Sequence, residues 1–126
     1  MRTERLEIGG VPAIVWGEST PRAYLYVHGK MSCKESARVL AEIAAAKGFQ
    51  TVSFDLPEHG ERAGRPPRCD VWNDMADLLA VADWTLTRWR EVSLCACSLG
   101  AYFALQSCAA PCSSRRSSIW SGLFGR

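Results

Sequence analysis

Segments typical of strands and of helices alternate along most of this 126-residue chain, and this order restricts the fold more than any other feature. Two short strands are predicted at Leu6–Gly9 and Val11–Trp16, and the Gly-Gly pair between them is typical of a hairpin turn. Aromatic and apolar residues then predict a third strand at Ala23–Gly29. Two later segments also read as strands, Phe49–Pro57 and Trp89–Cys97.

Helical patterns fill the gaps between these strands. The first helix is expected at Ser36–Lys47, where Gly48 ends it and the apolar stripe comprises Val39, Leu40, Ile43 and Ala44. A second helix should begin after an N-cap at Asp70, with an apolar face formed by Trp72, Met75, Leu78, Leu79 and Ala82. A third is expected at Leu99–Cys108. The order β-β-β-α-β-α-β-α predicts an α/β fold with a mostly parallel sheet and helices on both faces.

Composition excludes several classes of protein. The chain is long enough for one domain, with 48% hydrophobic and 22% charged residues, as in ordinary globular proteins. A net charge of +2 gives no reason to expect a nucleic-acid partner. No run approaches the ~18 apolar residues of a membrane span, and the start lacks the apolar core of a signal peptide. We therefore expect no membrane partner and a cytoplasmic location.

One short stretch, CACSLGAYFAL from Cys95 to Leu105, contains the strongest candidate for a catalytic residue. Ser98 stands between a predicted strand and a predicted helix, with Ala96 two residues before it and Gly100 two residues after it. This small-x-Ser-x-small pattern is that of a nucleophile elbow, a turn so sharp that larger flanking side chains would collide with the backbone. The pattern predicts an exposed Ser98 and a buried Cys97, although an isolated match of this length also occurs by chance.

Cysteines offer an alternative interpretation of the same region. Cys95, Cys97, Cys108 and Cys112 could form a metal set with the spacing C-x-C…C-x3-C. Structural zinc sites favour C-x2–4-C pairs on turns, whereas the first two of these cysteines fall on one predicted strand. We therefore expect no metal and treat most of the six cysteines as small buried apolar residues.

Three polar, glycine-containing turns are predicted at the carboxyl edge of the sheet, where α/β folds place their chemistry. They are His28–Met31, Asp55–Arg62 with its D-x-P-x-H-G pattern, and the elbow itself. Together, and in this order, they resemble the α/β-hydrolase superfamily in its serine-hydrolase, esterase-like branch. The resemblance covers about residues 6–106 and corresponds to the N-terminal half of such a domain.

The resemblance implies roles for individual residues. Ser98 would be the nucleophile that attacks an ester or another small acyl substrate. The backbone N–H groups of Leu99 and Lys30 would form the oxyanion hole, with Met31 as a near alternative to Lys30. The resemblance makes His28, Gly29 and His59 residues of site-lining turns and not the general base. No cofactor or metal is implied.

The chain also departs from the family pattern, because no His, Asp or Glu follows Ser98. From residue 107 onward the sequence is irregular and rich in Ser, Arg and Cys. One allowed choice of codons, read out of register, encodes an apolar strand and a turn there. We therefore divide the chain into a partial hydrolase domain, 1–106, and a tail, 107–126, that is out of frame or irregular by nature.

Three hypotheses remain open at this stage. The first is a serine hydrolase whose triad acid and base this chain lacks. The second is a truncated fragment without activity, and the third, less favoured, is a non-enzymatic binding module. In all three, Val92–Cys97 should lie at an edge of the sheet without charge, Pro or Gly, so we expect self-association through it.

Overall fold

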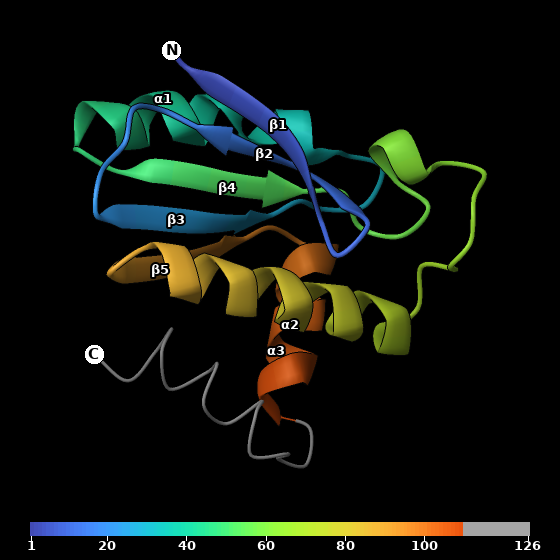
Figure 1. Ribbon diagram of the computed structural model, residues 1–126. Coiled ribbons are helices and arrows are strands. Elements are labelled where there is room, and N and C mark those ends of the chain that lie inside the picture. Colours follow the sequence, from blue (N-terminus) through green and yellow to red (C-terminus); the bar gives the residue numbers. More distant parts are fainter. Residues whose placement is uncertain (110–126) are drawn as a thin grey trace.

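The computed structural model describes residues 1–109 of the chain. A single sheet forms its centre, with the strand order β1-β2-β4-β3-β5 (Figure 1). The strands are β1 (Thr3–Ile8), β2 (Val11–Trp16), β3 (Arg22–Val27), β4 (Gln50–Phe54) and β5 (Glu91–Ala96). The helices are α1 (Arg38–Ala46), α2 (Val71–Arg88) and α3 (Leu99–Ala109), with short 3-10 turns η1 (Lys34–Ala37) and η2 (Gly60–Arg62).

Four of the five strands run in the same direction, as expected of the predicted sheet, although two of the four strand pairings are antiparallel. β3 pairs in parallel with both β4 and β5, whereas β2 pairs antiparallel with both β1 and β4. Because β1 is antiparallel to β2, β2 alone runs against the other four strands. The β1–β2 hairpin closes through Gly9 and Gly10, whose φ angles of 58° and 83° give the left-handed turn that two-residue hairpins favour.

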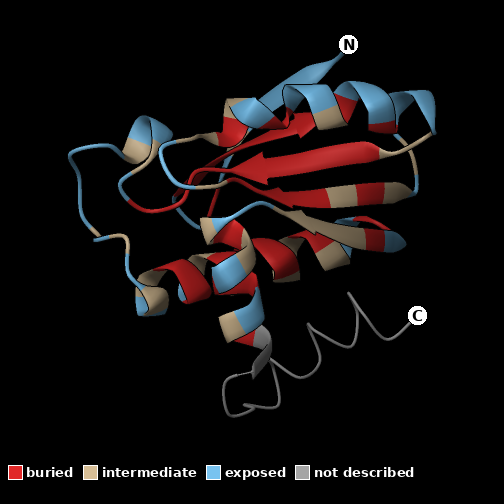
Figure 2. Ribbon diagram, turned by 180° about the vertical axis from the view of Figure 1, so that it is seen from behind, coloured by how far each residue is buried: buried red, intermediate tan, exposed pale blue. Residues whose placement is uncertain are grey.

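Helices cover both faces of the sheet, which confirms the predicted α/β architecture. The connection β3-α1-β4 moves along the sheet in one direction, and β4-α2-β5 moves back across β3. Two crossovers of the same hand in opposite directions place their helices on opposite faces. α1 accordingly packs on one face with Ile14, Trp16 and Tyr26. α2 and α3 share the other, larger core, and the strands between the layers are mostly buried (Figure 2).

The predicted apolar stripe of α1 is partly wrong. Val39 and Ile43 are 69% and 59% exposed, whereas Ala41 and Ala44 are buried. The helix turns its small residues toward the sheet because that face already carries the large side chains of Trp16 and Tyr26. Alanines let the helix backbone approach these rings closely, and the bulkier aliphatic residues then face outward.

α2 begins as predicted, because the Asp70 carboxylate accepts a hydrogen bond from the Asn73 N–H at 2.8 Å. Of its predicted apolar face, Met75, Leu78 and Ala82 are buried but Trp72 is 78% exposed. Trp72 lies in the first turn of the helix, which extends past the carboxyl ends of the strands (Figure 1). None of the helices within residues 1–109 is long and apolar enough to span a membrane.

The predicted tail, residues 107–126, falls mostly outside the described part of the chain. α3 continues through residues 107–109, and residues 110–126 are not described. The predicted division of the chain at residue 106 therefore stays a prediction.

Candidate functional site

Three turns meet at the carboxyl edge of the sheet. They follow β3, β4 and β5, and the strand order β4-β3-β5 places the turn after β3 between the other two. These are the turns that the sequence analysis singled out at His28–Met31, Asp55–Arg62 and Cys97–Gly100. The predicted site residues are thus brought together at one edge of the molecule.

The turn between β5 and α3 has the geometry of a nucleophile elbow. β5 ends at Ala96, α3 begins at Leu99, and Ser98 between them has a φ angle of 49°. A residue with a Cβ is uncommon in this left-handed region, which costs about 1–2 kcal/mol. The turn is closed by the Gly100 N–H, which donates to the Cys97 carbonyl at 2.9 Å. Ser98 is exposed, as predicted.

Small residues are required where this turn meets the end of β3. A Cβ added to Gly100 would lie 2.4 Å from the His28 carbonyl oxygen and 2.8 Å from the Val27 oxygen. A Cβ on Gly29 would lie 3.3 Å from the Ser98 Cβ. The elbow therefore packs directly against the turn after β3, through backbone contacts that leave no room for side chains.

The prediction that Cys97 is buried is wrong, since its side chain is exposed. The Cys97 N–H still donates to the Val27 carbonyl at 3.0 Å, but the residue lies one position past the end of β5, in the turn that leads to Ser98. Burial raises the pKa of the Tyr26 hydroxyl, and its hydrogen bond with Ser36 opposes this effect.

Two backbone N–H groups are available as oxyanion donors. Leu99 opens α3, so its N–H has no acceptor within the helix. The Lys30 N–H has no acceptor among the described residues. The Met31 N–H, the alternative to Lys30, donates instead to His59 Nε2 at 3.2 Å.

Both histidines of the chain have structural partners at both ring nitrogens. His28 is completely buried, with Nδ1 2.7 Å from the Gly29 oxygen, and its Nε2 accepts the Leu56 N–H at 3.0 Å. Burial lowers the pKa of His28. His59 Nδ1 lies 2.8 Å from the Pro57 oxygen. His28 belongs to the turn that packs against the elbow, and His59 belongs to the next turn, after β4. Neither histidine has a ring nitrogen free to take the Ser98 proton.

Sequence reasoning missed a buried ion-pair cluster beneath these turns. Lys34 is 1% exposed and Asp55 is 0% exposed, and Lys34 Nζ lies 2.8 Å from Asp55 Oδ2 and 2.6 Å from Glu61 Oε2. Burial alone would lower the pKa of Lys34, but hydrogen bonds to these carboxylates raise it. The Asp55 carboxylate also accepts the backbone N–H groups of Lys34 and Glu61, at 2.9 Å and 3.0 Å.

This cluster joins the loop before α1 to the turn after β4. A Cβ on Gly60 would overlap the Asp55 carboxylate, at 2.2 Å from its Oδ1, so this position requires a residue without a side chain. The sequence signal that could have indicated this cluster is Asp55, a carboxylate that directly follows a buried strand. Residues 1–109 contain no group of three or more His, Cys, Asp and Glu side chains that could hold a metal ion.

Comparison with solved structures bears on the fold. The chain is similar to the protein TT1662 from Thermus thermophilus, with 30% identity and a TM-score of 0.70 over 84% of this chain and 50% of that one. It is also similar to the esterase Pf2001 from Pyrococcus furiosus, at 20% identity, with a TM-score of 0.67 over 84% of this chain and 46% of that one. The chain has the α/β-hydrolase fold.

A third similar structure is a laboratory-evolved variant of potato epoxide hydrolase. This α/β-hydrolase-fold chain is 24% identical to it, with a TM-score of 0.66 over 82% of this chain and 34% of that one. The chain thus spans half or less of the length of these three structures. No protein-family model and no curated protein sequence matches it. The roles of Ser98, Lys30, Leu99, His28, Gly29 and His59 stay predictions.

Proposed function

We propose that this chain carries the nucleophile and oxyanion hole of a serine hydrolase that acts on an ester or other acyl substrate. The observation that carries the proposal is the elbow: Ser98 has a φ of 49° at a strand-to-helix turn. Gly29 lies against Ser98, and Gly100 packs against the end of β3. Strained backbone of this kind is retained where it presents a side chain for function.

Acyl transfer is the chemistry that this arrangement favours. Ser98 Oγ would bond to the substrate carbonyl carbon while its proton passes to a base, and the carbonyl oxygen would become negative. The N–H groups of Lys30 and Leu99 would stabilise that oxyanion. The similar structures include an esterase and an epoxide hydrolase, and a hydroxyl nucleophile beside two amide donors favours the reaction of the esterase.

The general base is the part that these 126 residues do not supply. No His, Asp or Glu follows Ser98, and both His28 and His59 use their ring nitrogens in other bonds. A serine without such a partner is a weak nucleophile. The second candidate function is therefore an inactive fragment, favoured by the same absence.

The coding DNA and a labelling experiment separate the two. If the other reading frame continues with Asp and His codons, a chain extended in that frame should react with a fluorophosphonate probe at Ser98. Labelling should disappear in Ser98→Ala and persist in Cys97→Ala, the matched control from the neighbouring exposed position. An extended chain that stays unlabelled, or that is labelled at Cys97, would refute the proposed function.

A further inference from the structure

The two histidines of the chain connect two of the site's turns in a reciprocal way. His28, from the turn after β3, accepts the Leu56 N–H of the turn after β4 at 3.0 Å. His59, from the turn after β4, accepts the Met31 N–H of the turn after β3 at 3.2 Å. The two rings lie against each other, with centroids 5.1 Å apart. We refer to these two rings and their four hydrogen bonds as the histidine pair.

The partners of each ring determine which nitrogen carries its proton. Nδ1 faces a carbonyl oxygen in both cases, Gly29 at 2.7 Å and Pro57 at 2.8 Å. A carbonyl oxygen can accept but not donate a hydrogen bond, so Nδ1 must be protonated. Nε2 accepts a backbone N–H and must therefore be unprotonated. Both rings are therefore neutral, and each presents Nε2 as an acceptor to a backbone N–H of the opposite turn.

The bond from Met31 restrains a part of the turn that packing does not hold. Met31 has a φ of 59°, in the left-handed region that disfavours residues with a Cβ, and its side chain is 89% exposed. Buried apolar contacts therefore cannot stabilise this conformation. The remaining bond across the turn, from the Ser32 N–H to the Gly29 oxygen, is long at 3.3 Å.

The same bond decides between the two candidate donors of the oxyanion hole. An amide that donates to His59 is not available to a substrate oxygen, which removes Met31. Lys30, one residue earlier, keeps an N–H without an acceptor among residues 1–109. Gly29, which precedes Lys30, is the residue that abuts Ser98.

We propose that His59 is a positioning residue for the oxyanion hole: its Nε2 holds the Met31 N–H, fixes the strained turn and leaves the Lys30 N–H as the donor. The role of the Lys30 N–H as an oxyanion donor rests on the proposed function. The restraint of Met31 by His59 does not rest on it, because these hydrogen bonds exist in the chain without substrate.

The first test needs no substitution. Nitrogen-15 shifts of the imidazole rings, measured by NMR on the 126-residue chain at pH 8, should show His59 with a protonated Nδ1 and a bare Nε2. The Met31 amide should exchange slowly with solvent and the Lys30 amide rapidly. A His59 ring protonated at Nε2 instead, or a Met31 amide that exchanges as fast as Lys30, overturns the proposal.

A pair of variants separates positioning from simple packing. In His59→Gln the side-chain oxygen can accept the Met31 N–H from nearly the position of Nε2, whereas His59→Leu has no acceptor. Met31 amide protection should fall at least about tenfold in His59→Leu and stay within about threefold of the parent in His59→Gln. Equal protection in all three proteins, or equal loss in both variants, contradicts the proposal.

Reactivity of Ser98 supplies the separate arm that concerns function. Slow phosphonylation of Ser98 by excess fluorophosphonate, followed by mass spectrometry, should be slower in His59→Leu than in the parent and restored in His59→Gln. If Ser98 reacts in none of the three, the oxyanion-hole role assigned to this turn is refuted for the 126-residue chain, while the Met31 measurement still decides the restraint and the extended chain still decides the proposed function. If Ser98 reacts equally in all three although Met31 protection is lost, the positioning role is refuted.

Discussion

At the scale of single residues, the elbow depends on the absence of a side chain at Gly100. In Gly100→Ala the new Cβ would meet the His28 oxygen at 2.4 Å and the Val27 oxygen at 2.8 Å, both backbone atoms of a central strand end. Because neither atom can rotate away, we expect Gly100→Ala to lower the free energy of unfolding by about 3 kcal/mol, measured by urea unfolding.

Gly64→Ala provides the matched control for Gly100→Ala. Gly64 has a φ of 72° and no atom within 4 Å of an added Cβ, so Gly64→Ala should cost about 1–2 kcal/mol through backbone strain alone. A Gly100→Ala protein as stable as Gly64→Ala would show that the elbow accommodates the added Cβ without a steric cost.

Asp74, in the first turn of α2, gives a prediction about pH. It is 0% exposed, its Oδ1 has no hydrogen-bond partner among the described residues, and its Oδ2 accepts from the Cys69 thiol at 3.2 Å. Burial, with added repulsion from Asp77 and Asp70, raises the pKa of Asp74 to about 6. The folded chain therefore binds a proton that the unfolded chain releases between about pH 4 and pH 6.

Stability should accordingly fall as pH rises through that window, because the charged form of Asp74 is the one that burial disfavours. Asp74→Asn should remove this slope and make the protein on the order of 2 kcal/mol more stable than the parent at pH 7, and little different at pH 4. Urea unfolding at both pH values measures it. Glu4→Gln, a change to an exposed carboxylate, should leave the slope unchanged; parallel curves for Asp74→Asn and parent would contradict the prediction.

At the scale of elements, β5 is the strand with most consequence for the behaviour of the chain. In residues 1–109 it pairs with β3 alone, and after Glu91 it carries no charge, Pro or Gly. Edge strands usually avoid pairing with other chains by such residues. We therefore expect the chain to self-associate through β5, and Ser93→Lys to reduce that association.

Light scattering at about 100 μM measures this effect. Ala46→Lys, which adds the same charge at an exposed position of α1, should associate as the parent does. A parent protein that stays monomeric at this concentration would show that the edge is protected.

The elements also show what sequence could and could not predict. All five strands and three long helices were predicted in the right order, because their periodicity and end signals are local. The sequence did not predict that Val39 and Ile43 face outward, because their orientation depends on the large residues that two distant strands present to α1. Likewise Ser98 followed from a five-residue pattern, whereas the Lys34–Asp55 pair joins residues 21 positions apart and leaves no local pattern.

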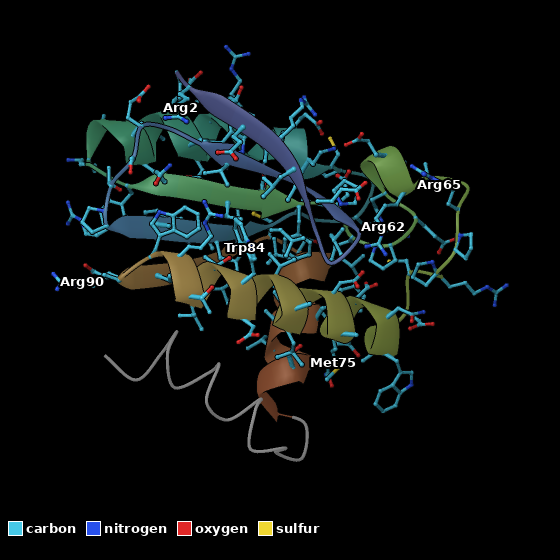
Figure 3. The ribbon with its side chains drawn as sticks, in the orientation of Figure 1. Arg2, Arg62, Arg65, Met75, Trp84 and Arg90 are labelled. Atoms are coloured by element: carbon cyan, nitrogen blue, oxygen red, sulfur yellow. The ribbon has the colours of Figure 1, made fainter. Side chains whose placement is uncertain are left out.

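At the scale of the whole molecule, two kinds of polar contact join the turns after β3 and β4 to their neighbours. Buried charges join the loop before α1 to the turn after β4, where Arg62 also pairs with Asp77 of α2. Figure 3 shows Arg62 and Arg65 on the loop that leads from β4 to α2. The histidine pair adds neutral hydrogen bonds between the turns after β3 and β4. These contacts hold the turn that contains Lys30, one of the two proposed oxyanion donors, and Leu99, the other, also lies within the described residues 1–109.

No His, Asp or Glu follows Ser98 in the sequence, and this leads to the last prediction. The purified 126-residue chain should hydrolyse an activated ester, such as p-nitrophenyl acetate, far below the rate of an ordinary esterase. Oxyanion donors and binding alone give a serine hydrolase at most about 10³–10⁴-fold over water once the base is removed. The residual rate should be little changed in Ser98→Ala, because it comes from oxyanion donors and binding and not from a base-activated Ser98. Turnover by the chain at an ordinary esterase rate, measured by release of p-nitrophenol, would mean that His28 or His59 leaves its partners to serve as the base.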